Sequence, residues 1–232
     1  MQNSDLFSGD YDSDKIANNY FKRYARFFES SQEKKIALLE LGILHGGSLL
    51  FWRDYFPSGT IVGVDISLPK DFKPGERIHA FEGNQADTVF LSQVAKETAP
   101  DGFDIIIDDA SHIGELTKVS FWHLFDHHLK PGGLYFIEDW GTGYWDDWPD
   151  GRSLDKESYF QTALRPDQSE SREPMPCHSY GMVGFIKQLV DEQAANDYTR
   201  KRQSGKSERG SKFERIVITP GIVMVRKAMQ MP

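Results

Sequence analysis

The sequence has few of the features of secreted and membrane proteins. Cys177 is its single cysteine, so no disulfide can form within the chain, and a cytoplasmic setting is expected. No apolar run approaches the length of about 18 residues that a membrane-spanning helix needs. Residues 1–15 are polar and acidic and lack the apolar core of a signal peptide. These absences disfavour a membrane partner.

Positive charge is also scarce. The chain has 27 lysines and arginines against 35 acidic residues, which gives a formal net charge of −8. This balance disfavours nucleic acid as a partner and suits a metal ion or a neutral small molecule. The main basic run, within residues 196–212, is rich in serine and glycine, and we interpret it as solvated surface.

The length of 232 residues suffices for one large domain with its own core. We expect a single domain over 1–232, with a helical segment within 1–34 and an aperiodic segment at 141–180. A stretch of that length without periodicity is typical of a lid over a functional site, or of disorder.

Short apolar runs alternate with segments of helical periodicity. Strands are predicted at 35–42, 60–67, 78–84, 103–110 and 133–140, helices at 15–29, 48–56, 87–97, 116–129 and 181–193, and a closing hairpin at 213–228. This alternation predicts an α/β fold, a doubly wound, mostly parallel sheet of seven strands with helices on both faces and a C-terminal antiparallel hairpin. Ligands of such sheets bind beyond the carboxyl ends of the strands.

The helix predicted at 15–29 places Tyr20 and Tyr24 among its regularly spaced aromatic positions. We interpret it as a helix packed against the main domain. His123, His127 and His128 lie on or just after the helix at 116–129, and we expect them to be structural or exposed.

A glycine-rich junction follows the first predicted strand. It contains the candidate cofactor residues Glu40, Gly42, His45, Gly46, Gly47 and Ser48. Glycines at such a junction let the backbone approach a ligand closely, and the helix that follows offers free N–H groups. The pattern is not G-x-G-x-x-G, which disfavours a nicotinamide cofactor.

Acid and amide side chains after the next two strands extend this pattern. Asp65 stands where a carboxylate would accept hydrogen bonds from ribose hydroxyls, and Gln85 could help to hold adenine. Glu40 suits a ligand that carries an ammonium group. S-adenosylmethionine has an ammonium group and a ribose but no phosphate, so it is the predicted cofactor. A strand–turn–helix junction without a ligand is the alternative.

Four carboxylates and a histidine follow the fourth and fifth strands. Asp108, Asp109 and His112 end one strand, and Glu138 and Asp139 end the other. Clustered carboxylates repel one another unless a cation lies among them, and oxygen ligands favour a hard ion such as Mg²⁺. Helix capping and solvated loop acids are the alternative. His112 is the candidate general base.

A metal ion would matter energetically for such a base. An alcohol with a pKa of about 15.7 and a histidine near about 6.5 differ by about nine units, or about 12 kcal/mol. A histidine alone is therefore too weak a base for an alcohol, whereas a cation beside the hydroxyl would close much of the gap.

Aromatic residues gather after the fifth strand. Trp140, Tyr144, Trp145 and Trp148 could cover a sugar face or a planar ring, although packing in the core explains each equally well. Trp140, Tyr144 and Trp145 are candidate substrate residues, together with His178 in the segment that follows.

Three stretches together resemble a known family. They are LLELGILHGGSLLFWRDYFPSGTIVGVDIS, IIIDDASH and LKPGGLYFIEDW. They are similar to the metal-dependent sugar O-methyltransferases of antibiotic biosynthesis, a group that includes macrolide and rhamnosyl O-methyltransferases and relatives named cephalosporin hydroxylases. The resemblance is specific over residues 38–140 and extends from Ser13-Asp14-Lys15 to the C-terminal hairpin.

The resemblance implies a Rossmann-like class I methyltransferase fold, S-adenosylmethionine and Mg²⁺. It implies Asp109, Glu138 and Asp139 as metal ligands and His112 as base. It implies cofactor contacts from Glu40, Gly42, Ser48, Asp65 and Gln85, with Asp108 either at the cofactor or behind it. It also indicates that the chain lacks the additional N-terminal domain of some relatives.

We therefore expect an O-methyltransferase that acts on a hydroxyl of a sugar or other vicinal diol bound to Mg²⁺. A catechol-type acceptor and a non-catalytic protein that binds S-adenosylmethionine are the two alternatives. The expected partner is a small-molecule acceptor, such as a glycosylated natural product, and a homo-oligomer stays open.

Overall fold

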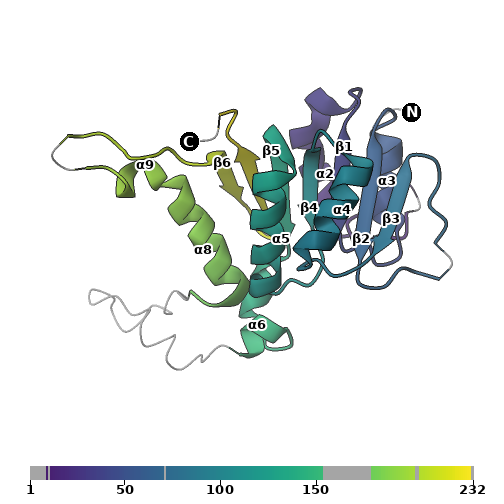
Figure 1. Ribbon diagram of the computed structural model, residues 1–232. Coiled ribbons are helices and arrows are strands. Elements are labelled where there is room, and N and C mark those ends of the chain that lie inside the picture. Colours follow the sequence, from purple (N-terminus) through teal and green to yellow (C-terminus); the bar gives the residue numbers. More distant parts are fainter. Residues whose placement is uncertain (1–8, 10, 71, 154–178, 202–203, 231–232) are drawn as a thin grey trace.

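One sheet organises the described chain. The computed structural model describes residues 9, 11–70, 72–153, 179–201 and 204–230 (Figure 1). The strands of these residues are β1 (Ala37–Leu41), β2 (Thr60–Asp65), β3 (Ile78–Glu82), β4 (Phe103–Asp108), β5 (Leu129–Glu138), β6 (Phe213–Ile218) and β7 (Ile222–Lys227). They form a single seven-stranded sheet of order β3-β2-β1-β4-β5-β7-β6.

Strands β1 to β5 pair in parallel, whereas β7 is antiparallel to both β5 and β6. The expected mostly parallel sheet with an antiparallel C-terminal hairpin is therefore confirmed. The strand order reverses between β1 and β4, because the chain runs outward through β2 and β3 and then returns to the centre. That reversal marks the edge where such sheets bind ligands.

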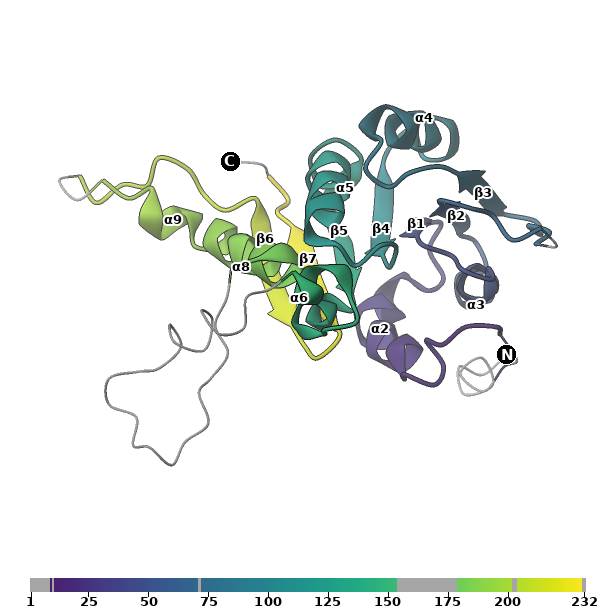
Figure 2. The same cartoon turned by 90° about the horizontal axis from the view of Figure 1, so that it is seen from below.

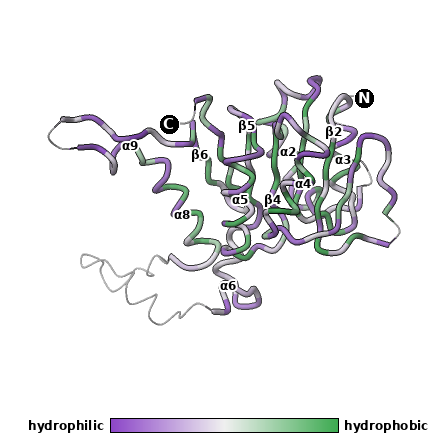
Figure 3. The backbone as a smooth tube through the Cα atoms, viewed as in Figure 1, coloured by the Kyte–Doolittle hydropathy of each residue, from purple (hydrophilic) through white to green (hydrophobic). Residues whose placement is uncertain are grey.

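Helices cover both faces of the sheet. Figure 2 shows α2 (Tyr20–Phe28) and α3 (Gly47–Tyr55) on one side, and α4 (Thr88–Thr98) and α5 (Gly114–His127) on the other. Helix α8 (Gly181–Gln193) packs beside α5. Leu38 lies in the core cluster with α2 and α3, and Leu39 lies in the cluster with α4, α5 and α8. Neighbouring residues of a strand thus bury opposite faces, and the central strands are apolar (Figure 3).

Three short helices complete the described elements. They are the 3₁₀ helices η1 (Glu29–Ser31) and η2 (Trp140–Tyr144) and the α-helix α6 (Pro149–Arg152), which lies in the predicted lid. A fourth short helix, α9 (Ala195–Tyr198), follows α8. Most of the predicted lid, including His178, lies outside the described residues. Every helix in the described part of the chain is too short or too polar to cross a membrane.

Several predicted boundaries differ from the structure, and two of them do so for the same physical reason. The helix predicted from residue 15 begins at Tyr20, because Asn19 has φ 55° and breaks the helical backbone. Strand β5 ends at Glu138 because Asp139 has φ 50°. Left-handed backbone of this kind is uncommon outside glycine and ends regular structure.

The three histidines at the end of α5 lie close together, and two of them contact the Ser92 hydroxyl. Nε2 of His123 lies 2.8 Å and Nε2 of His128 lies 3.0 Å from the Ser92 hydroxyl oxygen. Burial lowers the pKa of His128 to about 4, and the charges of His123, His127, Lys96 and Lys227 act in the same direction. The expectation that these histidines are structural or exposed agrees with the contacts of His123 and His128 and with the exposure of His127.

This cluster predicts a loss of stability in acid. The folded-state pKa of His128 lies below its ordinary value of about 6.5, so the unfolded chain binds the proton more readily. The free energy of unfolding should therefore fall as the pH drops from about 6.5 towards 4. Urea unfolding at about pH 7 and about pH 5 should show a smaller loss for His128→Gln than for the wild type. His79→Gln, on the exposed part of β3, should keep the wild-type loss, and an equal loss in His128→Gln would contradict the assignment.

Candidate active site

A cavity of about 620 Å³ opens at the carboxyl edge of the sheet. The loops that follow strands β1 to β5 line it, together with residues 12–15 before α2. The lining includes the predicted site residues Gly42, Ser48, Asp65, Gln85, Asp109, His112 and Asp139. Its size is that of small-molecule pockets, and it lies where the strand order reverses.

Gly42 brings two of these loops into close contact. Its φ is 82°, and its N–H donates to the carbonyl of Val64 over 2.7 Å. A Cβ atom at this position would lie 2.1 Å from the carbonyl oxygen of Asp109. Only glycine therefore allows the loop after β1 to touch the loop that carries Asp109.

Glu40 lies behind the cavity rather than in its wall. Its side chain is fully buried, and one carboxylate oxygen accepts a hydrogen bond of 2.7 Å from the Ser48 hydroxyl. Its other oxygen lies 3.4 Å from Nζ of Lys15. Burial raises the pKa of Glu40. The ammonium group beside Glu40 is therefore that of Lys15, whereas the sequence suggested the ammonium group of a ligand.

Lys15 is the residue that sequence reasoning missed. Its side chain is 3% exposed, and its ammonium contacts Asp109 and lies 3.0 Å from Glu138. Burial disfavours the ammonium, but the carboxylates of Asp109, Glu138 and Glu40 outweigh this effect and hold the pKa of Lys15 well above its usual value. The sequence marks Lys15 only by its place in Ser13-Asp14-Lys15, where the resemblance to the sugar O-methyltransferases begins.

Asp65 shapes the glycine-rich loop. One of its oxygens accepts hydrogen bonds from the N–H groups of Ile43, over 2.8 Å, and Leu44, over 3.2 Å. Its other oxygen accepts from the N–H of Ser67 over 3.1 Å. Asp65 therefore holds the loops after β1 and β2 together at the cavity edge.

Gln85 joins the cavity to a buried polar group. Its carbonyl oxygen accepts a hydrogen bond of 3.0 Å from the N–H of Ser111, and its amide donates to Asp108 over 3.2 Å. Asp108 is 2% exposed and also accepts from the Ser120 and Tyr135 hydroxyls. Burial raises the pKa of Asp108 to about 6. Within the described residues Asp108 is thus behind the wall, where it orients Gln85.

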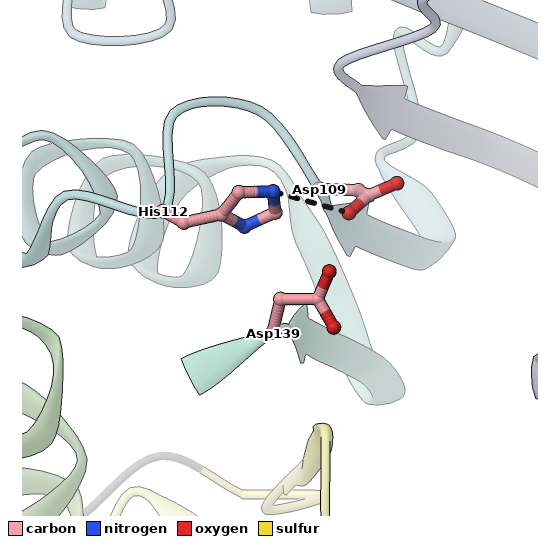
Figure 4. Close-up of side chains that lie close together, drawn as sticks. All are labelled: Asp109, His112 and Asp139. Atoms are coloured by element: carbon pink, nitrogen blue, oxygen red, sulfur yellow. Dashed lines mark ion pairs between the residues drawn. The ribbon is translucent and has the colours of Figure 1, made fainter. Parts of the chain in front are cut away.

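Asp109, His112 and Asp139 all line the cavity, and their side chains lie close together (Figure 4). Each residue has one possible metal-ligand atom within 4.8 Å of those of the other two, and Nε2 of His112 is 3.7 Å from Oδ1 of Asp109. His112 has φ 52° and Asp139 has φ 50°, so both side chains are aimed by left-handed backbone. Burial raises the pKa of Asp109.

Asp109 also belongs to a second group of acids. Oxygens of Glu40, Asp109 and Glu138 lie within 4.8 Å of one another, and Lys15 already places its ammonium among them. Glu138 is 1% exposed and lies behind Asp109 rather than in the cavity wall. The carboxylates of Asp109 and Asp139, which face the cavity beside His112, fit a divalent cation, and Asp109 also lies close to Glu138.

Trp148 is the aromatic residue that lines the cavity. Its ring centroid lies 5.7 Å from that of His112. Trp140 instead donates from Nε1 to the carbonyl of Thr219 over 2.9 Å, and Trp145 is 54% exposed. Trp140, Tyr144 and Trp145, three of the four predicted substrate residues, are absent from the described cavity wall.

The remaining glycine-loop residues also lie outside that wall. His45 is exposed, and its Nδ1 lies 2.9 Å from a carboxylate oxygen of Asp12. Gly46 and Gly47 form the N-terminus of α3. Of the described residues, neither glycine nor His45 lines the cavity.

The sheet order and the cavity at its reversal define the class I methyltransferase fold. A solved structure agrees with this assignment, namely the MycE methyltransferase of the mycinamycin biosynthetic pathway in complex with Mg and SAH. The match has a TM-score of 0.65 and 28% identity, and it covers 89% of this chain and 49% of that one. No family model matches the chain.

The chain is also similar to curated sugar O-methyltransferases. It is 41% identical over 175 residues to the mycinamicin VI 2''-O-methyltransferase of Micromonospora griseorubida, covering 72% of this chain and 38% of that protein. It is 41% identical over 129 residues to the demethylmacrocin O-methyltransferase of Streptomyces fradiae, covering 53% of this chain and 32% of that protein. The chain thus spans well under half the length of these relatives. The family resemblance expected from the sequence is confirmed.

The contact at Gly42 predicts a strong effect of one methyl group. Gly42→Ala should lower the free energy of unfolding by at least about 2 kcal/mol, because it adds left-handed strain and a clash with the Asp109 backbone. Gly141→Ala is the matched control, since a Cβ there meets no atom within 4 Å, and its change should stay within about 0.5 kcal/mol. Equal changes in urea unfolding for the two variants would contradict this account of the loop.

Proposed function

We propose that the chain transfers a methyl group from S-adenosylmethionine to a hydroxyl of a sugar or other vicinal diol, with Mg²⁺ or a similar divalent ion. Its similarity to sugar O-methyltransferases and to MycE, solved with Mg and SAH, supports this reaction. The acceptor is proposed to be a sugar or a glycosylated natural product, and the setting the cytoplasm.

A single observation carries the proposal. The glycine-rich loop with Asp65 and Gln85 lines the same cavity as Asp109, His112 and Asp139. A methyl donor on the first group of residues and an acceptor hydroxyl on the second would share one space. Methyl transfer needs this proximity, because much of its acceleration comes from holding the reacting groups in line.

The predicted cofactor residues are proposed to act either by direct contact or by supporting the cavity wall. Gly42, Ser48, Asp65 and Gln85 stand in the cavity wall and would contact S-adenosylmethionine. The other predicted cofactor residues, Glu40, His45, Gly46, Gly47 and Asp108, would act by supporting that wall. The buried hydrogen bond between Ser48 and Glu40 is an example of such support.

Asp109, Glu138 and Asp139 are proposed to hold the divalent ion. Asp109 and Asp139 face the cavity beside His112, and a carboxylate oxygen of Asp109 lies within 4.8 Å of one of Glu138. When bound, such a cation would lower the pKa of a nearby hydroxyl and stabilise the negative charge that develops on its oxygen.

His112 is proposed as the general base. Its side chain is 13% exposed, faces the cavity and lies beside Asp109, whose carboxylate would stabilise the imidazolium. The hydroxyl oxygen forms a bond to the methyl carbon as the carbon–sulfur bond breaks, and the hydroxyl proton passes to the imidazole. The products are a methyl ether and S-adenosylhomocysteine.

Trp148 is the residue proposed to meet the acceptor. Its ring lies beside His112 and could cover the apolar face of a sugar while a hydroxyl points at the base. Trp140, Tyr144 and Trp145 would then influence the acceptor from outside the described wall, and His178, which is not among the described residues, stays a predicted substrate residue.

Transfer of a labelled methyl group tests the proposal. Wild-type protein with S-adenosylmethionine and Mg²⁺ should methylate glycosides that carry vicinal hydroxyls, and EDTA should abolish the reaction. His112→Gln should lower kcat about 100-fold or more while leaving the affinity for S-adenosylhomocysteine unchanged, because it removes only the base. His79→Gln, on the edge strand β3, should keep the wild-type kcat.

Other outcomes would favour the alternatives. Turnover of catechols alone, with a small effect of His112→Gln, would indicate a catechol-type enzyme, whose hydroxyl is more acidic. Binding of S-adenosylmethionine without turnover of any acceptor would indicate an accessory protein.

A further inference from the structure

One stretch of chain, from Lys15 to Tyr24, contacts all three acids that are proposed to hold the cation. Each of the three acids has a hydrogen-bond partner in this stretch, and Lys15 also lies 3.0 Å from Glu138. The pairs are Lys15 with Asp109, Tyr24 with Glu138, and Tyr20 with Asp139. Tyr20 and Tyr24 each donate a hydrogen bond of 2.6 Å, and they lie one turn apart on α2.

Each contact involves only one of the two carboxylate oxygens. Tyr20 bonds Oδ1 of Asp139, and Tyr24 bonds Oε1 of Glu138, the oxygen that Lys15 also approaches. Oδ2 of Asp139 and Oε2 of Glu138 are bonded by neither tyrosine. Helix α2 therefore holds one oxygen of each acid and does not engage the other.

Helix α2 is well supported for this task. The ring of Phe21 stacks on that of Phe51 at 3.5 Å, and the ring of Tyr24 packs edge-on against Trp52 and Phe136. Tyr24 is fully buried and Tyr20 is 8% exposed. Both hydroxyls therefore have fixed positions and little competition from water for their carboxylates.

We propose that Tyr20 and Tyr24 are positioning residues of the cation site. Their hydroxyls hold Asp139 and Glu138 in the orientation that presents the second oxygen of each to the ion. This inference rests on the proposed function, because it takes Glu138 and Asp139 as the acids of that site. Groups that hydrogen-bond to metal ligands commonly contribute about 10-fold to 100-fold to metal affinity.

Mn²⁺ titration followed by electron paramagnetic resonance tests the role directly, without acceptor or turnover. Tyr20→Phe and Tyr24→Phe remove only the hydroxyl and keep the packed ring. Each should raise the Kd for Mn²⁺ about tenfold or more, while the Kd for S-adenosylhomocysteine changes less than about twofold.

Tyr11→Phe is the matched control. Tyr11 lies in the same N-terminal part of the chain and also donates to a carboxylate, that of Asp54, over 3.0 Å, but Asp54 is not one of the three acids. Its loss should leave the Kd for Mn²⁺ within about twofold of the wild type. Thermal unfolding in EDTA, run on all three variants, separates a change in metal binding from a loss of folding.

The outcomes separate this inference from the function on which it rests. If the wild type binds Mn²⁺ and both α2 variants bind it equally well, the positioning role is wrong and the proposed function stands. An equal weakening in Tyr11→Phe would likewise overturn the role, because it would indicate general loosening of the N-terminal segment. If the wild type binds no Mn²⁺, the cation of the proposed function and the inference both fail.

Discussion

The buried ammonium of Lys15 is the interaction on which the site depends. It lies among Glu40 at the end of β1, Asp109 after β4 and Glu138 at the end of β5, and it comes from the segment before α2. Three carboxylates so close together repel one another without a cation. Removing one partner of a buried ion pair costs about 3–5 kcal/mol of folding stability. The Lys15 side chain therefore stabilises the packing of the segment before α2 against the ends of three strands.

Other features of the site help to bring the ends of these strands close together. Gly42 lets the loops after β1 and β4 touch, and Asp65 holds the glycine-rich loop in place from β2. His112 and Asp139 adopt left-handed backbone, which costs on the order of 1–2 kcal/mol for each residue. Such strain persists where the surroundings fix it, and here it directs an imidazole and a carboxylate into one cavity. The strain is therefore part of how the site is built.

Much of the fold could be predicted from the sequence because its signals are local. The apolar run that became β4 and the glycine at Gly42 each indicate their structure from a few neighbouring residues. The carboxyl ends of parallel strands meet at one edge, so Asp109 and Asp139 could be expected together. The start of α2 could not, since the left-handed backbone of Asn19 carries no clear signal in the sequence.

The support of the site was not predictable in the same way. Lys15 and Tyr20 lie about a hundred residues from Asp109 and Asp139, and an amphipathic helix explains the position of Tyr20 without any site. The aromatic residues after β5 show the same limit, because composition singles out the group but only packing selects Trp148 for the cavity. Contacts between distant segments depend on the tertiary fold, which no local pattern contains.

A methyl donor and a divalent cation are proposed to share the cavity at the strand reversal. Anomalous diffraction from crystals grown with Mn²⁺ and S-adenosylhomocysteine tests this most directly. We expect one Mn²⁺ peak between the carboxylates of Asp109 and Asp139, with S-adenosylhomocysteine along the loop of Gly42 and Asp65 in the same cavity. Mn²⁺ bound elsewhere, or S-adenosylhomocysteine outside this cavity, would contradict this proposal.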